Sequence, residues 1–128
     1  MMELGHLESL QNTFNGREWC KFTALSNTDA TVELNIHIQD DLSWFAGHFP
    51  EQPVLPGVVQ THWACELAQH LFVLKGIQKV SNLKFKTMIL PNTQCVLKMT
   101  FNAEKKSVSF VFANEETTFS TGSLVFSA

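Results

Sequence analysis

Hydrophobic and polar residues alternate with a period of two in several stretches of this chain. The clearest stretch runs from Thr31 to Ile38, where every second residue is aliphatic and the residues between them are polar. This pattern is typical of a strand that has one face on the core and the other toward water. Further strands are predicted at residues 19–25, 79–89, 96–103, 107–113 and 117–127. Residues 1–17 show no firm periodicity and end in the turn signal Asn15-Gly16.

The inward positions of these strands follow from the same alternation. In the first stretch they are Val32, Leu34, Ile36 and Ile38, whereas Glu33, Asn35 and His37 face water. In the stretch 79–89 we expect Val80, Leu83, Phe85 and Ile89 to face the core, and in the stretch 107–113 Val108, Phe110 and Phe112.

One segment departs from this alternation. From Pro56-Gly57 to about Leu74 the residues are mostly apolar, and Gly76 follows as a stop signal. Eighteen or so residues at about 1.5 Å each form a helix roughly 27 Å long. One helix among five or six strands, the later ones adjacent in sequence, predicts an α+β fold in which the helix packs on an antiparallel sheet.

The composition fits one globular domain spanning residues 1–128. Hydrophobic residues make up 45% of the chain and charged residues 16%, as in soluble proteins. A net charge of −3 argues against nucleic acid as a partner, because nucleic acids favour a basic surface. Polar residues interrupt the longest apolar segment, and the first residues lack the layout of a signal peptide. We therefore expect a cytoplasmic protein with no membrane span.

A stiff turn that holds a histidine precedes the predicted helix. It reads Gly47-His48-Phe49-Pro50, and Pro53 and Pro56 then restrict the path to the helix at Gly57. A histidine suits general base chemistry near neutral pH. The first N–H groups of a helix lack partners within the helix and favour negative charge. The pattern indicates a site at the start of the helix.

The spacing of this set resembles the motif GHFPxxPVxPGV of the β-hydroxyacyl-acyl-carrier-protein dehydratases of bacterial fatty acid synthesis. A second segment, LKFK at 83–86 with LPNTQ at 90–94, is similar to that family's FK…PxPGDQ segment. The resemblance covers about residues 31–128. It implies the hotdog fold, a long central helix wrapped by a curved antiparallel sheet. It also implies a homodimer with active sites at the subunit interface and acyl carrier protein as the partner that brings the substrate.

The resemblance also implies roles for individual residues. His48 is the base that removes the C2 proton, and the backbone carbonyl of Val54 holds its ring. The backbone N–H of Gly57 is the oxyanion donor. Substrate contacts fall on Val54, Phe45, Phe49 and Val58, with core filling as the alternative for the two phenylalanines. No cofactor is implied, because the thioester itself acidifies C2.

One position departs from the family pattern. The family carries a Glu or Asp fourteen residues after the catalytic histidine, supplied by the partner subunit, whereas this chain has His62 there. The next carboxylate is Glu66, one helical turn further, where the family usually has Gln. We hypothesise that His62 takes the place of the acid and is tuned by Glu66. The alternative is that these residues, with Gln69 and His70, form the solvated face of the helix.

Several interpretations stay open from sequence. The departure at His62 points to a specialised branch, similar to the small dehydratases of aryl polyene or polyketide-like pathways. The alternatives are a hotdog thioesterase using Glu66 or Glu51, and a non-catalytic subunit that binds acyl carrier protein. Lys84 and Lys86 are candidates for contact with carrier protein or for simple solubility.

Two other kinds of site are disfavoured. A metal site from His48, His62 and Glu66 has suitable ligands but no recognised spacing. The three cysteines, Cys20, Cys65 and Cys95, form no CxxC pair and are expected to be reduced. A nucleophilic Cys65 beside His62 is therefore not favoured.

Overall fold

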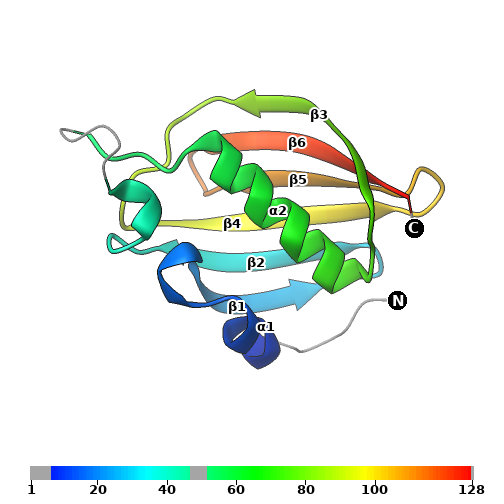
Figure 1. Ribbon diagram of the computed structural model, residues 1–128, viewed down its shortest axis with the longest axis horizontal. Helices are drawn as coiled ribbons and strands as arrows, with labels where there is room; N and C mark the ends of the chain where they lie inside the picture. Colours follow the sequence, from blue (N-terminus) through cyan, green and yellow to red (C-terminus); the bar gives the residue numbers. More distant parts are fainter. Residues whose placement is uncertain (1–6, 47–51, 128) are drawn as a thin grey trace.

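The computed structural model describes residues 7–46 and 52–127 (Figure 1). Six strands form one sheet in the order β1-β2-β4-β5-β6-β3, and all neighbouring strands are antiparallel. The strands are β1 (Lys21–Asn27), β2 (Thr31–Ile38), β3 (Ile77–Phe85), β4 (Thr93–Asn102), β5 (Ser107–Ala113) and β6 (Thr118–Phe126). The helices are α1 (Leu7–Thr13) and α2 (Gly57–Phe72), with short 3-10 turns η1 (Gly16–Glu18) and η2 (Ser43–Phe45). The predicted α+β class and hotdog-like arrangement are confirmed.

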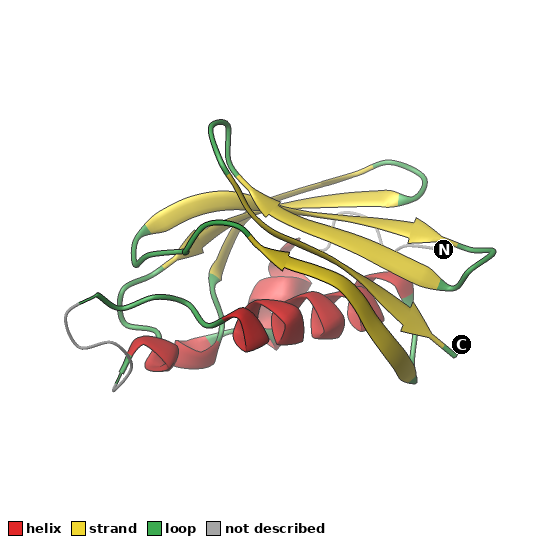
Figure 2. Ribbon diagram, turned by 90° about the horizontal axis from the view of Figure 1, so that it is seen from above, coloured by secondary structure: helices red, strands yellow, loops and turns green. Residues whose placement is uncertain are grey.

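The core lies between α2 and the face of the sheet that curves around this helix (Figure 2). The strand register aligns the inward residues of neighbouring strands. Leu34 of β2 lies opposite Leu97 of β4, which in turn lies opposite Phe112 of β5. All three side chains are fully buried. The predicted inward residues of β2 and β5 are therefore confirmed as core.

Helix α2 forms the second layer. It begins at the predicted Gly57 and ends at Phe72, two residues before the predicted end, because Val73 adopts a left-handed conformation with φ of 54°. The face toward the sheet is buried and includes Val59, Gln60, Trp63, Ala64, Leu67, Ala68, Leu71 and Phe72. Within the described ranges 7–46 and 52–127, no helix combines the length and apolarity that a membrane span needs.

Two features differ from the sequence pattern. Helix α1 was not indicated, because seven residues are too few for a helical period to stand out; its Leu10 is nevertheless fully buried. Strand β3 has the predicted direction of side chains, since Val80 lies opposite Leu124 and Phe85 opposite Ser120. The expected burial is wrong for Val80, Leu83 and Phe85, which remain 40–50% exposed, and confirmed for Ile89, which lies beyond the end of β3 and is fully buried. The reason for the exposure is that β3 is the last strand of the sheet and lies beside α2 rather than beneath it (Figure 1); its end meets the helix start at Phe85.

Candidate active site

Within residues 7–46 and 52–127, the first backbone donors of α2 have no hydrogen-bond partner. Pro56 is the N-cap residue, and its carbonyl accepts from the N–H groups of Val59 and Gln60 at 3.1 and 3.2 Å. The N–H groups of Gly57 and Val58 precede these first helical bonds, so the helix itself gives them no partner. Pro56 has no side-chain group that could cap them. This end of the helix can therefore bind a negatively charged oxygen.

Gly57 is also required by packing. A Cβ atom at this position would lie 2.8 Å from Cζ of Phe85 and 2.9 Å from its Cε1. The ring of Phe85 therefore packs directly on the first turn of α2, and any larger residue at position 57 would displace it. The glycine thus has a structural reason as well as the predicted chemical one.

A pocket of about 440 Å³ opens beside this helix start. Its volume is within the range of small-molecule sites. The lining is mostly apolar and comes from the turn before α2, from the first turn itself and from the end of β3: Val54, Leu55, Pro56, Gly57, Gln60, Phe85, Lys86, Thr87 and Met88. The predicted substrate contact at Val54 and the predicted oxyanion donor at Gly57 therefore share one pocket.

The turn before α2 is fixed by hydrogen bonds that the sequence analysis missed. The N–H of Leu55 donates to the carbonyl of Ile89 at 2.8 Å. The side-chain Nε2 of Gln60 donates to the carbonyl of Leu55 at 3.1 Å, and Oγ of Ser120 donates to Oε1 of Gln60 at 2.6 Å. The signal in the sequence was Gln60 itself, a polar residue at a position where the helical period requires an apolar side chain.

Some predicted site residues cannot be placed. His48 and Phe49 lie outside the described residues, as do Gly47, Pro50 and Glu51. Phe45 is described, and it packs in the hydrophobic core with 9% exposure. This agrees with the core-filling alternative for Phe45, and its role as a substrate contact stays a prediction.

His62 and Glu66 do not face the pocket of their own chain. Five residues along an α-helix correspond to a rotation of about 140° and a rise of about 7.5 Å, so His62 points well away from the side of α2 that carries Gly57. Glu66 is on the opposite side, at about 180° and 13.5 Å. His62 is exposed, and its ring lies against that of Trp19 with centroids 5.9 Å apart. Val58, another predicted contact, is 79% exposed on the same outward side.

The cysteine thiols are poor nucleophiles here. Burial raises the pKa of the Cys65 thiol, and the neighbouring Glu66 carboxylate raises it further. Burial also raises the pKa of Cys95 to about 12. Among residues 7–46 and 52–127, no three His, Cys, Asp or Glu side chains converge as metal ligands would.

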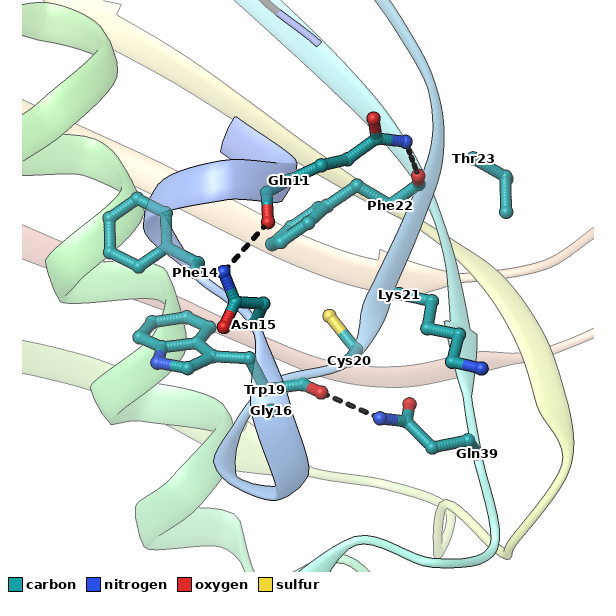
Figure 3. A pocket seen from close by; sticks show the side chains of 10 residues that line it. All are labelled: Gln11, Phe14, Asn15, Gly16, Trp19, Cys20, Lys21, Phe22, Thr23 and Gln39. Carbon is teal, nitrogen blue, oxygen red and sulfur yellow. Dashed lines mark hydrogen bonds between the residues drawn. The ribbon is translucent and has the colours of Figure 1, made fainter. Parts of the chain in front are cut away.

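A second pocket lies away from α2's first turn. It has a volume of about 340 Å³ and is formed by α1, the start of β1 and Gln39 (Figure 3). The buried side chain of Gln39 donates from Nε2 to the carbonyl of Trp19 at 2.8 Å. None of the predicted site residues lines this pocket.

Comparison with known proteins decides the family. The family model described as ApeI dehydratase matches residues 24–123, which include the whole of α2, strands β2 to β5 and the first part of β6. The chain belongs to the ApeI-like dehydratase family. The dehydratase resemblance predicted from the motif is thus confirmed.

Relatives support this assignment. A 3-hydroxyacyl-[acyl-carrier-protein] dehydratase FabZ from Streptococcus pneumoniae is 36% identical over 84 residues; the alignment covers 57% of this chain and 58% of the relative. A chain of the structure described as the dehydratase heterocomplex ApeI:P from Xenorhabdus doucetiae is 26% identical, with a TM-score of 0.78 over 84% of this chain and 96% of that one.

The fold itself does not separate the possible activities. A mutant thioesterase, PA1618 from Pseudomonas aeruginosa, superposes with a TM-score of 0.56 at 13% identity, over 98% of this chain and 95% of that one. A dehydratase and a thioesterase therefore share the architecture, and the ApeI-like assignment depends on the sequence match.

Proposed function

We propose that this chain is a dehydratase that removes water from 3-hydroxyacyl thioesters carried on acyl carrier protein. The observation that carries the proposal is the start of α2, where the Gly57 and Val58 N–H groups precede the helical bonds beside an apolar pocket. Such groups stabilise a thioester oxygen as it gains negative charge. The ApeI-like family model spans this helix and supports the same chemistry.

In the proposed reaction, His48 accepts the C2 proton of the substrate, with its ring held by the carbonyl of Val54. The electrons of the C2–H bond move toward the thioester, whose oxygen accepts the N–H of Gly57. An acid donates a proton to the 3-hydroxyl group, the C3–O bond breaks, and water and a 2-enoyl thioester are released. No separate cofactor takes part, because the thioester acidifies C2.

We propose His62 as the acid, supplied by a second chain. The rotation of about 140° between Gly57 and His62 keeps this imidazole away from the pocket of its own chain. The exposed side of α2 that carries Val58, His62 and Glu66 is free to face the pocket of a partner. Glu66, one turn further along α2, is proposed to assist His62.

The edge of β3 is the proposed contact with that second chain. The sheet ends at β3, and an unpaired edge strand can pair with a strand of another chain. Its inner side carries Ile77, Val80, Leu83 and Phe85, all 40–50% exposed. A partner strand would complete the hydrogen bonds of β3 and cover these side chains.

Two kinds of partner fit this surface. A second copy of the chain forms the predicted homodimer. A different hotdog chain is the alternative, and the heterocomplex in which the ApeI relative was solved favours it. Light scattering of the purified chain distinguishes them: a dimer supports the second copy, and a monomer supports the different chain.

The proposed substrates are conjugated, flat acyl chains of the aryl polyene type. The motif with His62 in place of the family carboxylate supports a specialised branch, and the ApeI-like assignment agrees with it. A higher hydration rate with an aryl-enoyl thioester than with a crotonyl thioester is expected. Equal or reversed rates would contradict this refinement and leave the dehydratase proposal standing.

The decisive experiment measures water addition to crotonyl and aryl-enoyl thioesters on carrier protein by mass spectrometry. We expect His48→Ala and His62→Ala to lose turnover. His70→Ala is the matched control, because His70 is an exposed histidine two turns further along the same helix. Release of free thiol without water addition would identify a thioesterase. Carrier binding without any turnover would identify a non-catalytic subunit.

Mixing the two inactive variants tests the two-chain site. If each site uses His48 of one copy and His62 of the other, a mixed dimer contains one intact site. Random exchange of equal amounts then restores about a quarter of the wild-type activity. If the dimers exchange chains and turnover is not restored, either both histidines act within one chain or His62 has no part in the mechanism.

A further inference from the structure

Two of the buried polar side chains in this protein are bonded to each other at the proposed site. Among the described residues, Gln39, Gln60 and Ser120 are the polar side chains that are buried. Gln60 is 3% exposed and Ser120 is fully buried. Burying an amide is costly unless both its donor and its acceptor find partners. Gln60 has both, one on either side: the Leu55 carbonyl and the Ser120 hydroxyl.

The bonds of Gln60 connect the turn and the helix start, which line the pocket, to β6, the strand beside β3. The Leu55 carbonyl belongs to the turn that lies between the His48 segment and Gly57. Ser120 belongs to β6 and lies directly opposite Phe85 of β3, the residue whose ring packs on Gly57. Gln60 itself is in the first turn of α2 and lines the pocket. One side chain therefore ties the turn, the helix start and the strand pair together.

We propose that Gln60 is a positioning residue for the dehydration reaction, held in place by Ser120. It fixes the path of residues 54–57, and hence the position of the Gly57 N–H relative to the pocket. The inference rests on the proposed function. Its physical basis is that a shift of about 1 Å in a catalytic group can cost on the order of 100-fold in rate.

The two bonds of Gln60, to the Leu55 carbonyl and the Ser120 hydroxyl, form what we call the Gln60 clamp. The other hydrogen bond of this turn does not replace it. The Leu55 N–H donates to the carbonyl of Ile89, and this bond holds the peptide that precedes the Leu55–Pro56 peptide. The Leu55 carbonyl points toward the helix and has Gln60 as its partner. Without this bond the peptide between Leu55 and Pro56 can change its orientation, and the Gly57 amide moves with it.

The test compares Gln60→Met with Gln39→Met. Methionine is close to glutamine in length and removes both hydrogen bonds of Gln60. Gln39 is the matched control, because it is also buried and donates to a backbone carbonyl, but it lines the second pocket, which shares no residue with the pocket at the proposed site. We expect kcat for thioester hydration to fall about 10- to 100-fold in Gln60→Met, with KM changed less than about threefold. Gln39→Met is expected to keep kcat, at a temperature well below both unfolding midpoints.

Ser120→Ala adds a graded variant. It keeps Gln60 and removes the hydroxyl that bonds to Oε1, so a smaller loss of kcat, about 3- to 10-fold, is expected. A fall in stability alone, with kcat unchanged in both Gln60→Met and Ser120→Ala, would show that the cluster only supports the fold and would overturn the inference.

Amide hydrogen exchange makes the test independent of turnover. Deuterium uptake by the peptide that covers residues 54–58 is expected to rise in Gln60→Met and to stay unchanged in Gln39→Met. Equal uptake in the two variants would overturn the clamp even if kcat changed. If the wild type hydrates no thioester, the proposed function fails, whereas the exchange result still decides whether Gln60 holds the turn.

Discussion

Replacing Gly57 by alanine tests the contact between α2 and Phe85 most directly. The new Cβ atom would lie 2.8 Å from Cζ of Phe85 and 3.1 Å from its Cε2, so either the ring or the helix start must move. Phe85 is 50% exposed, which lets the ring swing toward solvent. We therefore expect the ring to yield and the helix start to stay.

The size of the effect follows from two opposing contributions. Overpacking costs about 1–3 kcal/mol, and the exposed ring places this case at the lower end. Alanine is favoured over glycine in a helix by up to about 1 kcal/mol, less in the first turn. Gly57→Ala is therefore expected to destabilise the protein by about 1 kcal/mol. In a Phe85→Ala background the clash is gone, and the same substitution is expected to be neutral or stabilising.

Urea denaturation of the wild type, the two single variants and the double variant measures this change of sign. All four are compared at one protein concentration, because pairing of β3 with another chain would make stability depend on concentration. A coupling free energy of about 1–2 kcal/mol is expected. Additivity within about 0.5 kcal/mol would refute the packing of Phe85 on Gly57.

Further outcomes are expected from other parts of the molecule. Because burial raises the pKa of Cys95 to about 12 from an ordinary 9.0, the thiol ionises first in the unfolded chain, and the free energy of unfolding should fall as pH rises above 9. A Cys95→Ala variant should show a shallower fall in a pH series of urea titrations; an equal slope contradicts the assignment. Lys86→Glu, at the pocket, should raise KM for carrier-bound thioesters but not for a short thioester of the same acyl group, and an equal rise for both argues against carrier contact. Val80→Asp should abolish pairing of β3 with a second chain in light scattering, and retained assembly would place the contact elsewhere.

The sequence predicted strand faces well but not what covers them. In β2 the alternating aliphatic residues are buried, as expected, because the sheet places β2 between β1 and β4 and α2 lies over it. The same reasoning applied to Val80 and Phe85 gave the right side of the sheet and the wrong exposure. A period of two reports the direction of side chains, whereas burial depends on where the strand lies in the sheet order.

The sequence predicted only part of the candidate site, because the rest depends on which segments the fold brings together. The motif assigned roles to Gly57 and Val54, and the structure places both at one pocket, whereas the roles themselves stay predictions. It gave no indication of Gln60, since a polar residue on an apolar helix face acquires a partner only when Ser120, sixty residues later, is brought beside it. It also left the environment of His62 open, because the exposed side of a helix can face water or another chain, and one sequence does not distinguish them.

Gly57 now has two separate reasons to be a glycine, and they predict different behaviour. If glycine serves only the packing of Phe85, the double variant Gly57→Ala/Phe85→Ala recovers stability, and its kcat equals that of Phe85→Ala alone. The backbone N–H remains in both. If glycine also lets the thioester approach the backbone closely, the Cβ atom still obstructs the substrate after the clash is relieved. Stability then recovers while kcat stays below that of Phe85→Ala, and the difference measures the chemical role separately from the structural one.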